Sequence, residues 1–441
     1  MRALAFALLL PAAVFCQTNP IVRFDTNLGN IDVELYPADA PKTVANFLSY
    51  VNKGAYTNSI IHRSVARPTP FVIQGGGYRL NTNSVDPIPS DPAVVNEFKI
   101  PNTRGTIAMA KQEGNPNSAT NQWFFNLADN TGNLDVQNGG FTVFGKILND
   151  SSLVIMDRIA AVPTYQSPYA DTTPLLNYRP GQVVGPANFV TIRSIRPLAR
   201  AISAGAFGAF GEAAPGSYLE IYGVDLAATT RSWEARDFNN GAAPTSLDDV
   251  KVTIGGQDAF ISYISPTQVN VQVPENVAPG ATVPVVVSYQ GQEKAFGSIT
   301  IKPVAAGLLA PESFKVGDYQ FVVAQHQDRS LVGIPAIPNV PDAPAKAGET
   351  LTFYGVGFGA VDSGPVGGRL AQGLPRVVAP VQFFFGDREA RVDYAGLVPG
   401  LVGLYQFNVV VPSGLGSQDL PLRVTVGGAN LTQTLYIPVR E

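Results

Sequence analysis

The residues with the clearest chemical potential lie in one stretch, residues 61–80, which reads IHRSVARPTPFVIQGGGYRL. His62 and Arg63 precede an apolar run that ends in Gln74 and three glycines. Three kinds of site could use such a combination: a glycine loop around a phosphate, a hydrolase with His62 as its base, or a site in which an arginine acts on a planar amide.

Spacing and composition argue against the first two sites. The glycines of QGGGYRL are not followed by the Lys-Ser/Thr pair of a phosphate loop. A hydrolase needs a nucleophile, but the chain has no G-x-S-x-G motif and its only cysteine is Cys16. The only other histidine, His326, lies in the C-terminal half, so a zinc site is excluded as well. We therefore expect no metal and no cofactor, and we interpret His62 as a satisfied core residue.

The arginine site is the one that remains. Arg63 follows the apolar residues SIIH and precedes FVIQ, as expected for a side chain on a strand. Its forked donors could hold a planar amide. A surface salt bridge is the alternative, and the residue pattern alone favours it.

The composition indicates a protein rich in strands and turns, and the N-terminal segment indicates export. Of the 441 residues, 15% are charged, against about 25% in an ordinary soluble domain. The net charge of −4 gives no reason to expect nucleic acid as a partner. Residues 1–16, MRALAFALLLPAAVFC, have the short basic start and apolar run of a signal peptide. No later segment is apolar enough to span a membrane.

The single cysteine bears on the final location. A lipoprotein signal requires a small residue before the acylated cysteine, and here Phe15 precedes Cys16. We therefore expect simple cleavage after Cys16 rather than a lipid anchor. The mature protein would lie in the periplasm, on the cell surface or in the medium, without disulfides.

The segments on both sides of residues 61–80 predict the elements that must position the site. Residues 21–36 alternate around TNLGN, which predicts a hairpin. Val44, Phe47, Leu48 and Val51 have the spacing of one apolar helix face, with Pro41 at the start and Gly54 after the end. Residues 152–162 predict a second helix and 189–197 a closing strand. This pattern predicts a mainly β domain over residues 21–197, a closed sheet capped by two helices.

The rest of the chain predicts two related β-sandwiches, residues 198–303 and 304–441. An internal repeat supports this division, because four segments of the first half recur in order in the second. The matched pairs of segments are 215–227 with 347–359, 250–264 with 381–396, 267–274 with 404–412, and 282–301 with 419–439. Each copy has about seven short strands, the pattern of an immunoglobulin-like sandwich.

Four segments carry a resemblance to a known family. They are IHRSVARPTPFVIQGGG, NEFKIPNTRGTIAMAKQ, SATNQWFFNLAD and NLDVQNGGFTVFGKI. In order and spacing they resemble the signature segments of the cyclophilin-type peptidyl-prolyl cis-trans isomerases, and the bacterial exported type looks closest. The resemblance implies an eight-stranded β-barrel capped by two helices, a rotamase activity on X–Pro bonds, and proline-containing, unfolded or partly folded proteins as partners.

The resemblance also implies roles for individual residues. Arg63 matches the catalytic arginine, which donates to the prolyl nitrogen. Phe71 and Gln74 match the pocket aromatic and a glutamine that binds the substrate backbone. The other residues that match the family's substrate-binding positions are Met109, Ala110, Lys111, Gln122, Phe124, Leu134 and Phe141.

Four departures from the family pattern are visible. The segment SVARPTP, residues 64–70, is three residues longer than usual, which would reshape the pocket beside Arg63. Asn133 stands where many eukaryotic members have tryptophan, and Phe141 where they have histidine. Lys111 replaces an asparagine that runs along the peptide. The longer loop leaves open an alternative function, a proline-segment binding or adhesion protein with a weakly active or inactive barrel.

The sandwiches resemble IPT/TIG-type domains, whose fold implies binding or spacing and not chemistry. We expect a cell-surface or polysaccharide ligand for them if they bind anything. Tyr222 and Tyr354 recur in YGV, with Gly223 and Gly355, and could form a shared ligand site or be core tyrosines before a tight turn. Asn270 and Asn408 recur in the same way, and we interpret them as structural.

Overall fold

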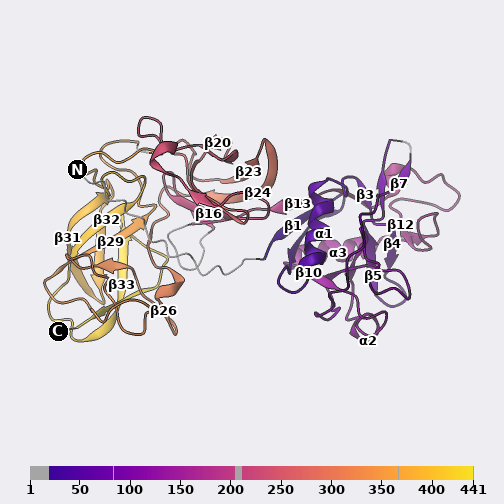
Figure 1. Cartoon of the computed structure of the whole chain (residues 1–441), viewed down its shortest axis with the longest axis horizontal. Coiled ribbons are helices and arrows are strands. Elements are labelled where there is room, and N and C mark those ends of the chain that lie inside the picture. The colour runs from indigo at the N-terminus through magenta and orange to yellow at the C-terminus, as the bar shows by residue number, and fades with distance from the viewer. Residues whose placement is uncertain (1–18, 83, 204–210, 366, 441) are drawn as a thin grey trace. The chain divides into compact units, whose positions relative to one another are not determined.

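The computed structural model describes residues 19–82, 84–203, 211–365 and 367–440, and these fall into two compact units, 19–198 and 199–440 (Figure 1). The predicted signal peptide and Cys16 lie outside the described residues. Each unit has its own core, so each is described by itself.

The first unit is a closed eight-stranded antiparallel barrel, as predicted. Two short consecutive segments, β3 and β4, together form one of the eight strands. The strands are β1 (Ile21–Thr26), β2 (Gly29–Leu35), β3 (Ser59–Ile60) with β4 (Arg63–Val65), β5 (Val72–Gly75), β8 (Thr106–Met109), β9 (Trp123–Asn126), β10 (Val143–Ile147) and β13 (Thr191–Leu198). Around the barrel the order of neighbours is β1, β2, β10, β8, β9, β5, β4 with β3, and β13, which pairs with β1 again. The ring therefore has no free edge.

Smaller elements lie in the connections between the barrel strands. Those between its strands or before its last strand are β6 (Tyr78–Leu80), β7 (Val85–Pro87), the short helix α2 (Thr131–Leu134), β11 (Thr164–Tyr165), β12 (Thr173–Pro174) and the 3₁₀ turn η1 (Pro186–Asn188). The sequence pattern did not predict α2, which is only one turn long.

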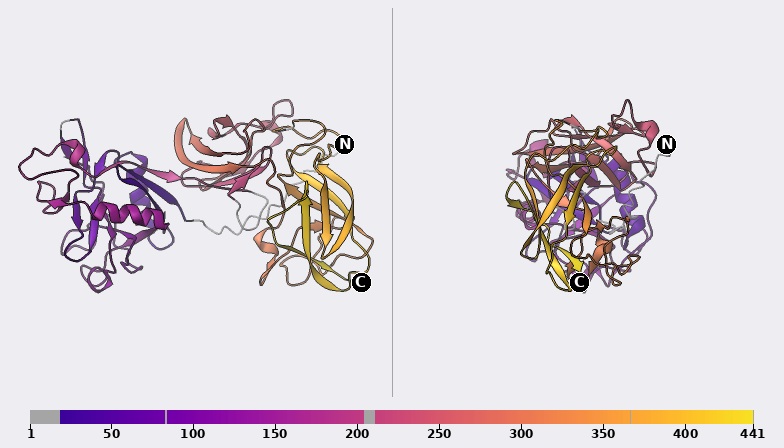
Figure 2. Two further views of the ribbon diagram at one scale, coloured as in Figure 1. Left: turned by 180° about the vertical axis from the view of Figure 1, so that it is seen from behind. Right: turned by 90° about the vertical axis from the view of Figure 1, so that its left-hand side faces the viewer.

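Two longer helices pack on the barrel, α1 (Pro41–Asn52) and α3 (Asp150–Ala160), and both are visible in Figures 1 and 2. Pro41 occupies the first turn of α1, where its missing N–H costs nothing. Val44, Phe47 and Val51 are buried as predicted, whereas Leu48 is only half-buried and Tyr50 fills the core instead. In α3 the side chain of Asn149 accepts a hydrogen bond from Ser152 N at 2.9 Å, which fixes the helix start.

The barrel interior is packed with aromatic rings. Phe24, Trp123 and Phe125 contact one another with ring centroids 5.0 to 5.5 Å apart, and all three are at most 1% exposed. Edge-to-face packing of this kind adds to the burial of apolar area. The barrel is therefore a filled core, and any substrate site must lie on its outside.

The second unit begins with a β-sandwich over residues 199–302. Its elements are β14 (Arg200–Ser203), β15 (Glu212–Ala213), β16 (Tyr218–Tyr222), β17 (Arg231–Ser232), η2 (Ala235–Asp237), β18 (Ser246–Leu247), β19 (Val250–Ile254), β20 (Gln257–Asp258), β21 (Phe260–Ile264), β22 (Gln268–Gln272), β23 (Thr282–Tyr289) and β24 (Gln292–Ile301). One sheet runs β14–β16–β22–β21–β17, and β19, β23 and β24 form the centre of the facing sheet. Between them lies a core of valine, leucine, isoleucine and alanine without a single aromatic ring among its buried members.

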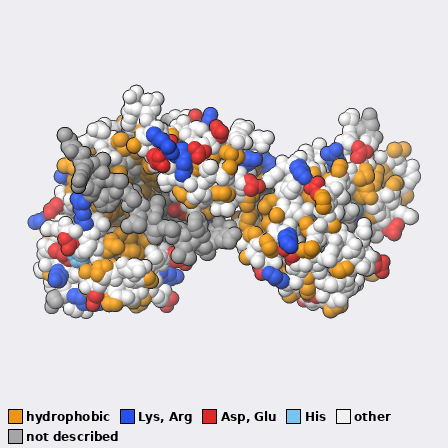
Figure 3. Space-filling model, viewed as in Figure 1, with side chains coloured by type: hydrophobic (Ala, Val, Ile, Leu, Met, Phe, Trp, Pro, Cys, Tyr) orange, Lys and Arg blue, Asp and Glu red, His pale blue; other side chains and the backbone are white. Residues whose placement is uncertain are grey.

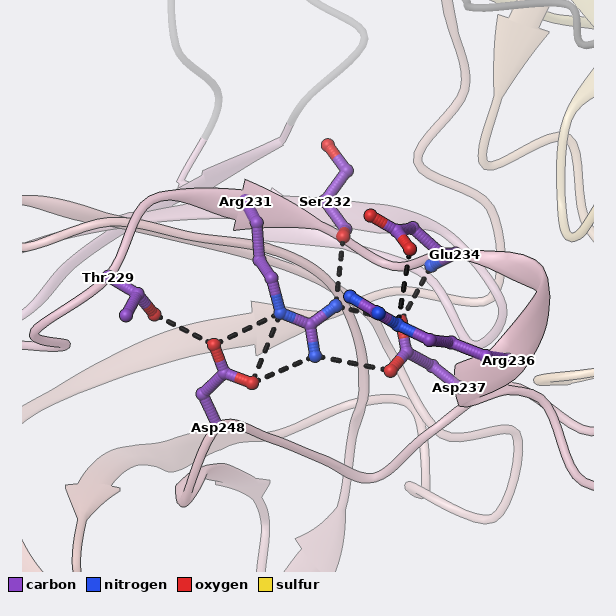
Figure 4. A network of polar contacts seen from close by, with 7 residues as sticks. All are labelled: Thr229, Arg231, Ser232, Glu234, Arg236, Asp237 and Asp248. Carbon is purple, nitrogen blue, oxygen red and sulfur yellow. Dashed lines mark hydrogen bonds and ion pairs between the residues drawn. The ribbon is translucent and has the colours of Figure 1, made fainter.

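A charged network ties the loops at one end of this sandwich (Figure 4). The guanidinium of Arg231 donates to Asp237 at 2.8 Å and to Asp248 at 2.8 Å, and Thr229 donates to Asp248 at 2.8 Å. The network joins β17, the 3₁₀ turn η2 and the turn before β19. Next to this network Arg236 pairs with Glu234. Asp248 and Arg236 are exposed, so the ion pairs that they form contribute little to stability individually. Their role is to fix the geometry of the loop.

The second sandwich repeats the first. Its elements are β25 (Gly307–Leu308), η3 (Glu312–Phe314), β26 (Lys315–Val316), β27 (Tyr319–Gln320), β28 (Ala324–Gln325), β29 (Thr350–Val356), β30 (Val381–Phe385), β31 (Arg388–Leu397), β32 (Tyr405–Val410), β33 (Gln418–Val426), β34 (Ala429–Asn430) and β35 (Leu435–Val439). The order β16–β22–β21 of the first sandwich recurs as β29–β32–β31. The predicted internal repeat is therefore a repeat of strands and of their pairing.

The recurring tyrosines and asparagines have structural partners. Tyr222 and Tyr354 are half-buried, so neither is a core tyrosine; both point away from the core because strand residues alternate. The Tyr222 hydroxyl donates to Glu220 at 2.6 Å and that of Tyr354 to Gln325 at 3.2 Å, and these different partners do not form a shared site. In contrast, Asn270 and Asn408 accept the same bond in both copies.

The donors to these two asparagines are glutamines two residues earlier, Gln268 and Gln406, each at 2.8 Å.

Gln272 links the two sandwiches inside the second unit. Its amide oxygen accepts from Gly368 N at 2.7 Å and its nitrogen donates to Gly216 O at 2.9 Å, and the side chain is 1% exposed. The bond from Gly368 crosses between the sandwiches, while the bond to Gly216 holds the Gln272 side chain in place within its own sandwich; a buried polar contact of this kind would be costly to leave unmade.

Raising the pH from 6 to 8.5 is expected to destabilise the second unit through His326. Its Nδ1 lies 2.9 Å from Glu349 Oε2 and its Nε2 lies 3.0 Å from the Ala343 carbonyl, so both nitrogens face acceptors and only the protonated ring satisfies both. Burial alone would lower the pKa of His326, but the bonds to Glu349 and Ala343, with smaller help from Asp328, raise this pKa above its ordinary value of 6.5.

Since the folded pKa exceeds the unfolded one, the stabilisation is complete below about pH 6.5 and is lost as the pH rises through the folded pKa. The urea midpoint of the second unit at the two pH values measures this change. His326→Gln should abolish the difference between pH 6 and 8.5, and an unchanged difference in that variant would assign the pH dependence to other groups.

The surface carries scattered charges of both signs with apolar patches between them (Figure 3). No helix in the described part of the chain combines the length and the apolar character needed to cross a bilayer. Within the described ranges, no group of His, Cys, Asp and Glu side chains is placed to hold a metal ion.

Candidate active site

A row of directly paired residues crosses the outer face of the barrel and defines the site. Arg63 on β4 pairs with Gln74 on β5, Gln74 with Phe124 on β9, and Phe124 with Ala108 on β8. Directly opposed residues of antiparallel strands project from the same face. Register alone therefore brings Arg63, Gln74 and Phe124 together, although they are far apart in the sequence.

A pocket with a volume of about 200 Å³ opens at this row. Its floor is the small apolar cluster of Val72, Ala108, Phe124, Leu134 and Val143, which is separate from the barrel core. The rings of Phe124 and Phe141 meet edge to face with centroids 5.8 Å apart. The residues that line the pocket are Arg63, Phe71, Val72, Gln74, Ala110, Lys111, Phe124, Leu134, Gln137 and Phe141. A small apolar pocket with two cations at its rim suits an apolar ring beside a peptide backbone.

Arg63 is held in place by a chain of amide contacts. Its Nη1 donates to Gln74 Oε1 at 3.1 Å, and Gln74 Nε2 donates to Gln122 Oε1 at 2.8 Å. Burial lowers the pKa of Arg63, but an arginine remains charged in proteins. Because only one of its five N–H groups is used by Gln74, the half-buried guanidinium retains donors for a ligand in the pocket.

His62 lies behind this chain and is not a satisfied core residue. It is 4% exposed, its ring contacts the ring of Tyr78, and its Nδ1 has no hydrogen-bond partner. Burial and the adjacent charge of Arg63 lower the pKa of His62 to about 4, against a small opposing effect of Gln122. The ring is therefore neutral at physiological pH, and it does not line the pocket.

Lys111 forms part of the opposite rim. Its Nζ donates to the carbonyls of Asn138 at 2.8 Å and Gly140 at 2.6 Å, and lies 4.7 Å from the centre of the Phe141 ring. Burial lowers the pKa of Lys111. The side chain thus fixes the turn that carries Phe141 into the pocket wall.

The structure brings together eight of the ten residues expected at the site: Arg63, Phe71, Gln74, Ala110, Lys111, Phe124, Leu134 and Phe141. Gln122 does not line the pocket, but it contacts Gln74 from behind. The expectation for Met109 was wrong. On β8, Ile107 and Met109 face the barrel interior, while Ala108 and the next residue after the strand, Ala110, belong to the cluster at the pocket; Met109 is 1% exposed in the barrel core.

Two lining residues were not predicted. Val72 lies two residues before Gln74 and shares its face of β5, so the strand period alone could have identified it. Gln137 lies after α2, and its amide donates to the side chain of Asn133. No sequence signal pointed to Gln137, because the loop after α2 has no periodic pattern.

The longer loop does not narrow the pocket. Phe71 N donates to Val65 O at 2.8 Å, which closes the hairpin at the base of the loop. Residues 67–70 are exposed, and no residue of 66–70 lines the pocket. The extra residues extend beyond a hairpin whose strands β4 and β5 pair without a register shift.

Comparisons with known proteins agree with this geometry. The family model described as cyclophilin type peptidyl-prolyl cis-trans isomerase/CLD matches residues 21–178, and the IPT/TIG domain model matches residues 205–302. The peptidyl-prolyl cis-trans isomerase of Acinetobacter baylyi is 44% identical over 149 residues, which are 33% of this chain and 74% of that protein. Peptidyl-prolyl cis-trans isomerase B of Escherichia coli is 37% identical over 154 residues, 33% of this chain and 88% of that protein.

Among solved structures, a cyclophilin type peptidyl-prolyl cis-trans isomerase of Cryptosporidium parvum, crystallised in the presence of the dipeptide Ala-Pro, covers 40% of this chain and 96% of its own. Its sequence identity is 22% and its TM-score 0.29.

Proposed function

The chain belongs to the cyclophilin-type peptidyl-prolyl cis-trans isomerases, and from this premise we propose that it is an exported isomerase in which Arg63 accelerates rotation about X–Pro bonds of client proteins. The observation that carries the proposal is the half-buried guanidinium of Arg63, oriented by Gln74 at 3.1 Å beside an apolar pocket. The pocket would hold the proline ring against Phe124, Phe71 and Leu134.

The chemistry follows from the electronic structure of the peptide bond. Resonance gives the C–N bond double-bond character and a rotation barrier of about 18 to 20 kcal/mol. An N–H of Arg63 that donates to the prolyl nitrogen would localise the lone pair on that nitrogen. The interaction is stronger in the twisted state, where the nitrogen is pyramidal, than in the planar ground state, and so it lowers the barrier.

The orientation of the guanidinium matters because the donor must lie over the nitrogen and not over the carbonyl oxygen. The two hydrogen bonds that connect Arg63 to Gln74 and Gln74 to Gln122 supply this orientation before the substrate arrives. The neutral His62 next to Arg63 adds no second charge that would repel it. No covalent intermediate is needed.

The direct test is the cis–trans exchange rate of an Ala-Pro-Phe peptide with and without the mature protein. Uncatalysed exchange takes tens to hundreds of seconds, so acceleration is easy to detect by exchange NMR. A folded protein that left this rate unchanged would refute the isomerase activity for such peptides.

Export is the second part of the proposal. It is supported by the basic start and apolar run of residues 1–16. Expressed with its N-terminus intact in a bacterial host, the protein should be recovered outside the cytoplasm with Gln17 as its first residue. Recovery of the unprocessed chain in the cytoplasm would contradict export without bearing on the activity.

A further inference from the structure

The pocket carries positive charge that its own side chains do not neutralise. Arg63 and Lys111 line it, and no Asp or Glu is among the lining residues in the described part of the chain. The acid nearest in sequence to the floor, Asp135, is engaged elsewhere. Its Oδ1 accepts from Asn102 N at 3.0 Å and from Asn102 Nδ2 at 2.8 Å. A negative charge in this pocket would therefore have to come from the ligand.

Lys111 is held far more rigidly than an ordinary surface lysine. Its ammonium is fixed by the carbonyls of Asn138 and Gly140 at 2.8 and 2.6 Å. These carbonyls belong to a turn in which Asn138, Gly139 and Gly140 all have positive φ, at 50°, 74° and 76°. The face of the Phe141 ring, 4.7 Å away, attracts the same cation. Because the side chain is already restrained, little further rotamer entropy is lost when it contacts a ligand.

The ammonium also has capacity for a ligand. It has three N–H donors, of which the two carbonyls use two. It is half-buried, so bulk water screens its charge less than that of an exposed lysine. Arg63 would contact the prolyl nitrogen of every X–Pro bond in the same way. Lys111 lies at the rim of the pocket, where it can distinguish the side chains that flank the proline in the substrate.

From this arrangement, and resting on the proposed function, we propose that Lys111 makes the site select X–Pro segments that carry a carboxylate, from Asp or Glu, on the residue immediately before or after the proline. The carboxylate would accept a charge-assisted bond from the restrained ammonium. A glutamine in the same position matches the shape of glutamate without the charge, so it serves as the reference.

The experiment compares two matched pairs of peptides by exchange NMR. In one pair Glu or Gln precedes the proline, and in the other Glu or Gln follows it. For at least one pair, the wild-type protein should show a kcat/KM that is about three- to tenfold higher for the Glu peptide at low salt, as expected for a partly screened charge pair. In 1 M salt, where the screening length falls to about 3 Å, the ratio should approach one.

Two substitutions at Lys111 and one control assign the effect. Lys111→Gln removes the charge and should abolish the preference, while Lys111→Arg keeps the charge and should retain it. Lys146→Gln makes the same charge change at an exposed position of β10 outside the pocket and should leave the ratio unchanged. Since Lys111 also fixes the turn before Phe141, the melting temperature of each variant is measured alongside.

Each outcome has a distinct meaning. Equal acceleration of the Glu and Gln peptides by the wild-type protein would overturn the proposed selection while leaving the isomerase activity intact. A preference that survives in folded Lys111→Gln would overturn the assignment to Lys111, as would a preference lost in Lys146→Gln. If none of the four peptides were accelerated, the proposed function itself would fail. If Lys111→Gln does not fold, a wild-type preference that persists in 1 M salt refutes the charge mechanism.

Discussion

Replacing Arg63 with alanine is expected to reduce kcat/KM for X–Pro exchange by about 10²- to 10³-fold, the loss seen when a donor that stabilises a transition state is removed. On the proposed mechanism, the lining residues Phe124, Leu134 and Phe71 would still bind the proline ring, but nothing would donate to the prolyl nitrogen. The effect should fall mainly on kcat, because the pocket floor remains.

The control is another arginine in the same hairpin. Arg67 is exposed in the 66–70 loop and does not line the pocket, so Arg67→Ala should retain wild-type exchange rates. Arg63→Lys tests the geometry, because lysine keeps the charge but lacks the rigid fork, and it should restore only a small part of the activity. Activity near the wild-type level in a folded Arg63→Ala protein would rule out the mechanism proposed for Arg63.

Replacing Phe407 with alanine is expected to destabilise the second unit by about 3 to 5 kcal/mol, the range for removing a large buried aromatic side chain. Phe407 is fully buried, and its ring centroid lies 4.4 Å from that of Phe358 and 5.4 Å from that of Phe383. The substitution would open a cavity between rings that cannot close it without moving β30 and the segment that follows β29.

The measurement is urea denaturation monitored separately for the two units, with exchange activity as the readout for the barrel. The cores do not share residues, so the barrel transition and the activity should be unchanged in Phe407→Ala. Val378→Ala, at a side chain that is 65% exposed, provides the control and should shift neither transition. Loss of activity in step with unfolding of the second unit would show that the barrel depends on the sandwiches for its stability.

Much of the barrel could be predicted from the sequence because its elements are locally encoded. The β1–β2 hairpin follows from alternation around TNLGN, and α1 from Val44, Phe47 and Val51 at helical spacing. Leu48 was placed wrongly because position 48 is near the edge of the apolar stripe, and the larger ring of Tyr50 takes the core position instead.

The site contains two kinds of residue. Some are placed by the alternation of side chains along a strand, and others are placed by the conformation of a loop. Alternation along β8 excludes Met109 and keeps Ala110, and alternation along β5 adds Val72 to Gln74. This information was in the sequence once the strand was located. In contrast, the contact of Lys111 with the carbonyls of Asn138 and Gly140 depends on the conformation of a turn with three positive φ values in succession, which residue types alone do not specify.

The pairing of β1 with β13 has a consequence for how the chain acquires its fold. These are the first and last strands of the barrel, and Ile21 pairs with Leu198 at opposite ends of the domain. The contact order of the barrel is therefore high, and domains of this kind fold in milliseconds to seconds rather than microseconds. A chain that crosses a membrane from its N-terminus onward cannot close the barrel until β13 has emerged. If the chain is exported as proposed, β1 and β2 would present a hairpin with two open edges during translocation, and aggregation in that interval would compete with folding until the last strand of the barrel arrives.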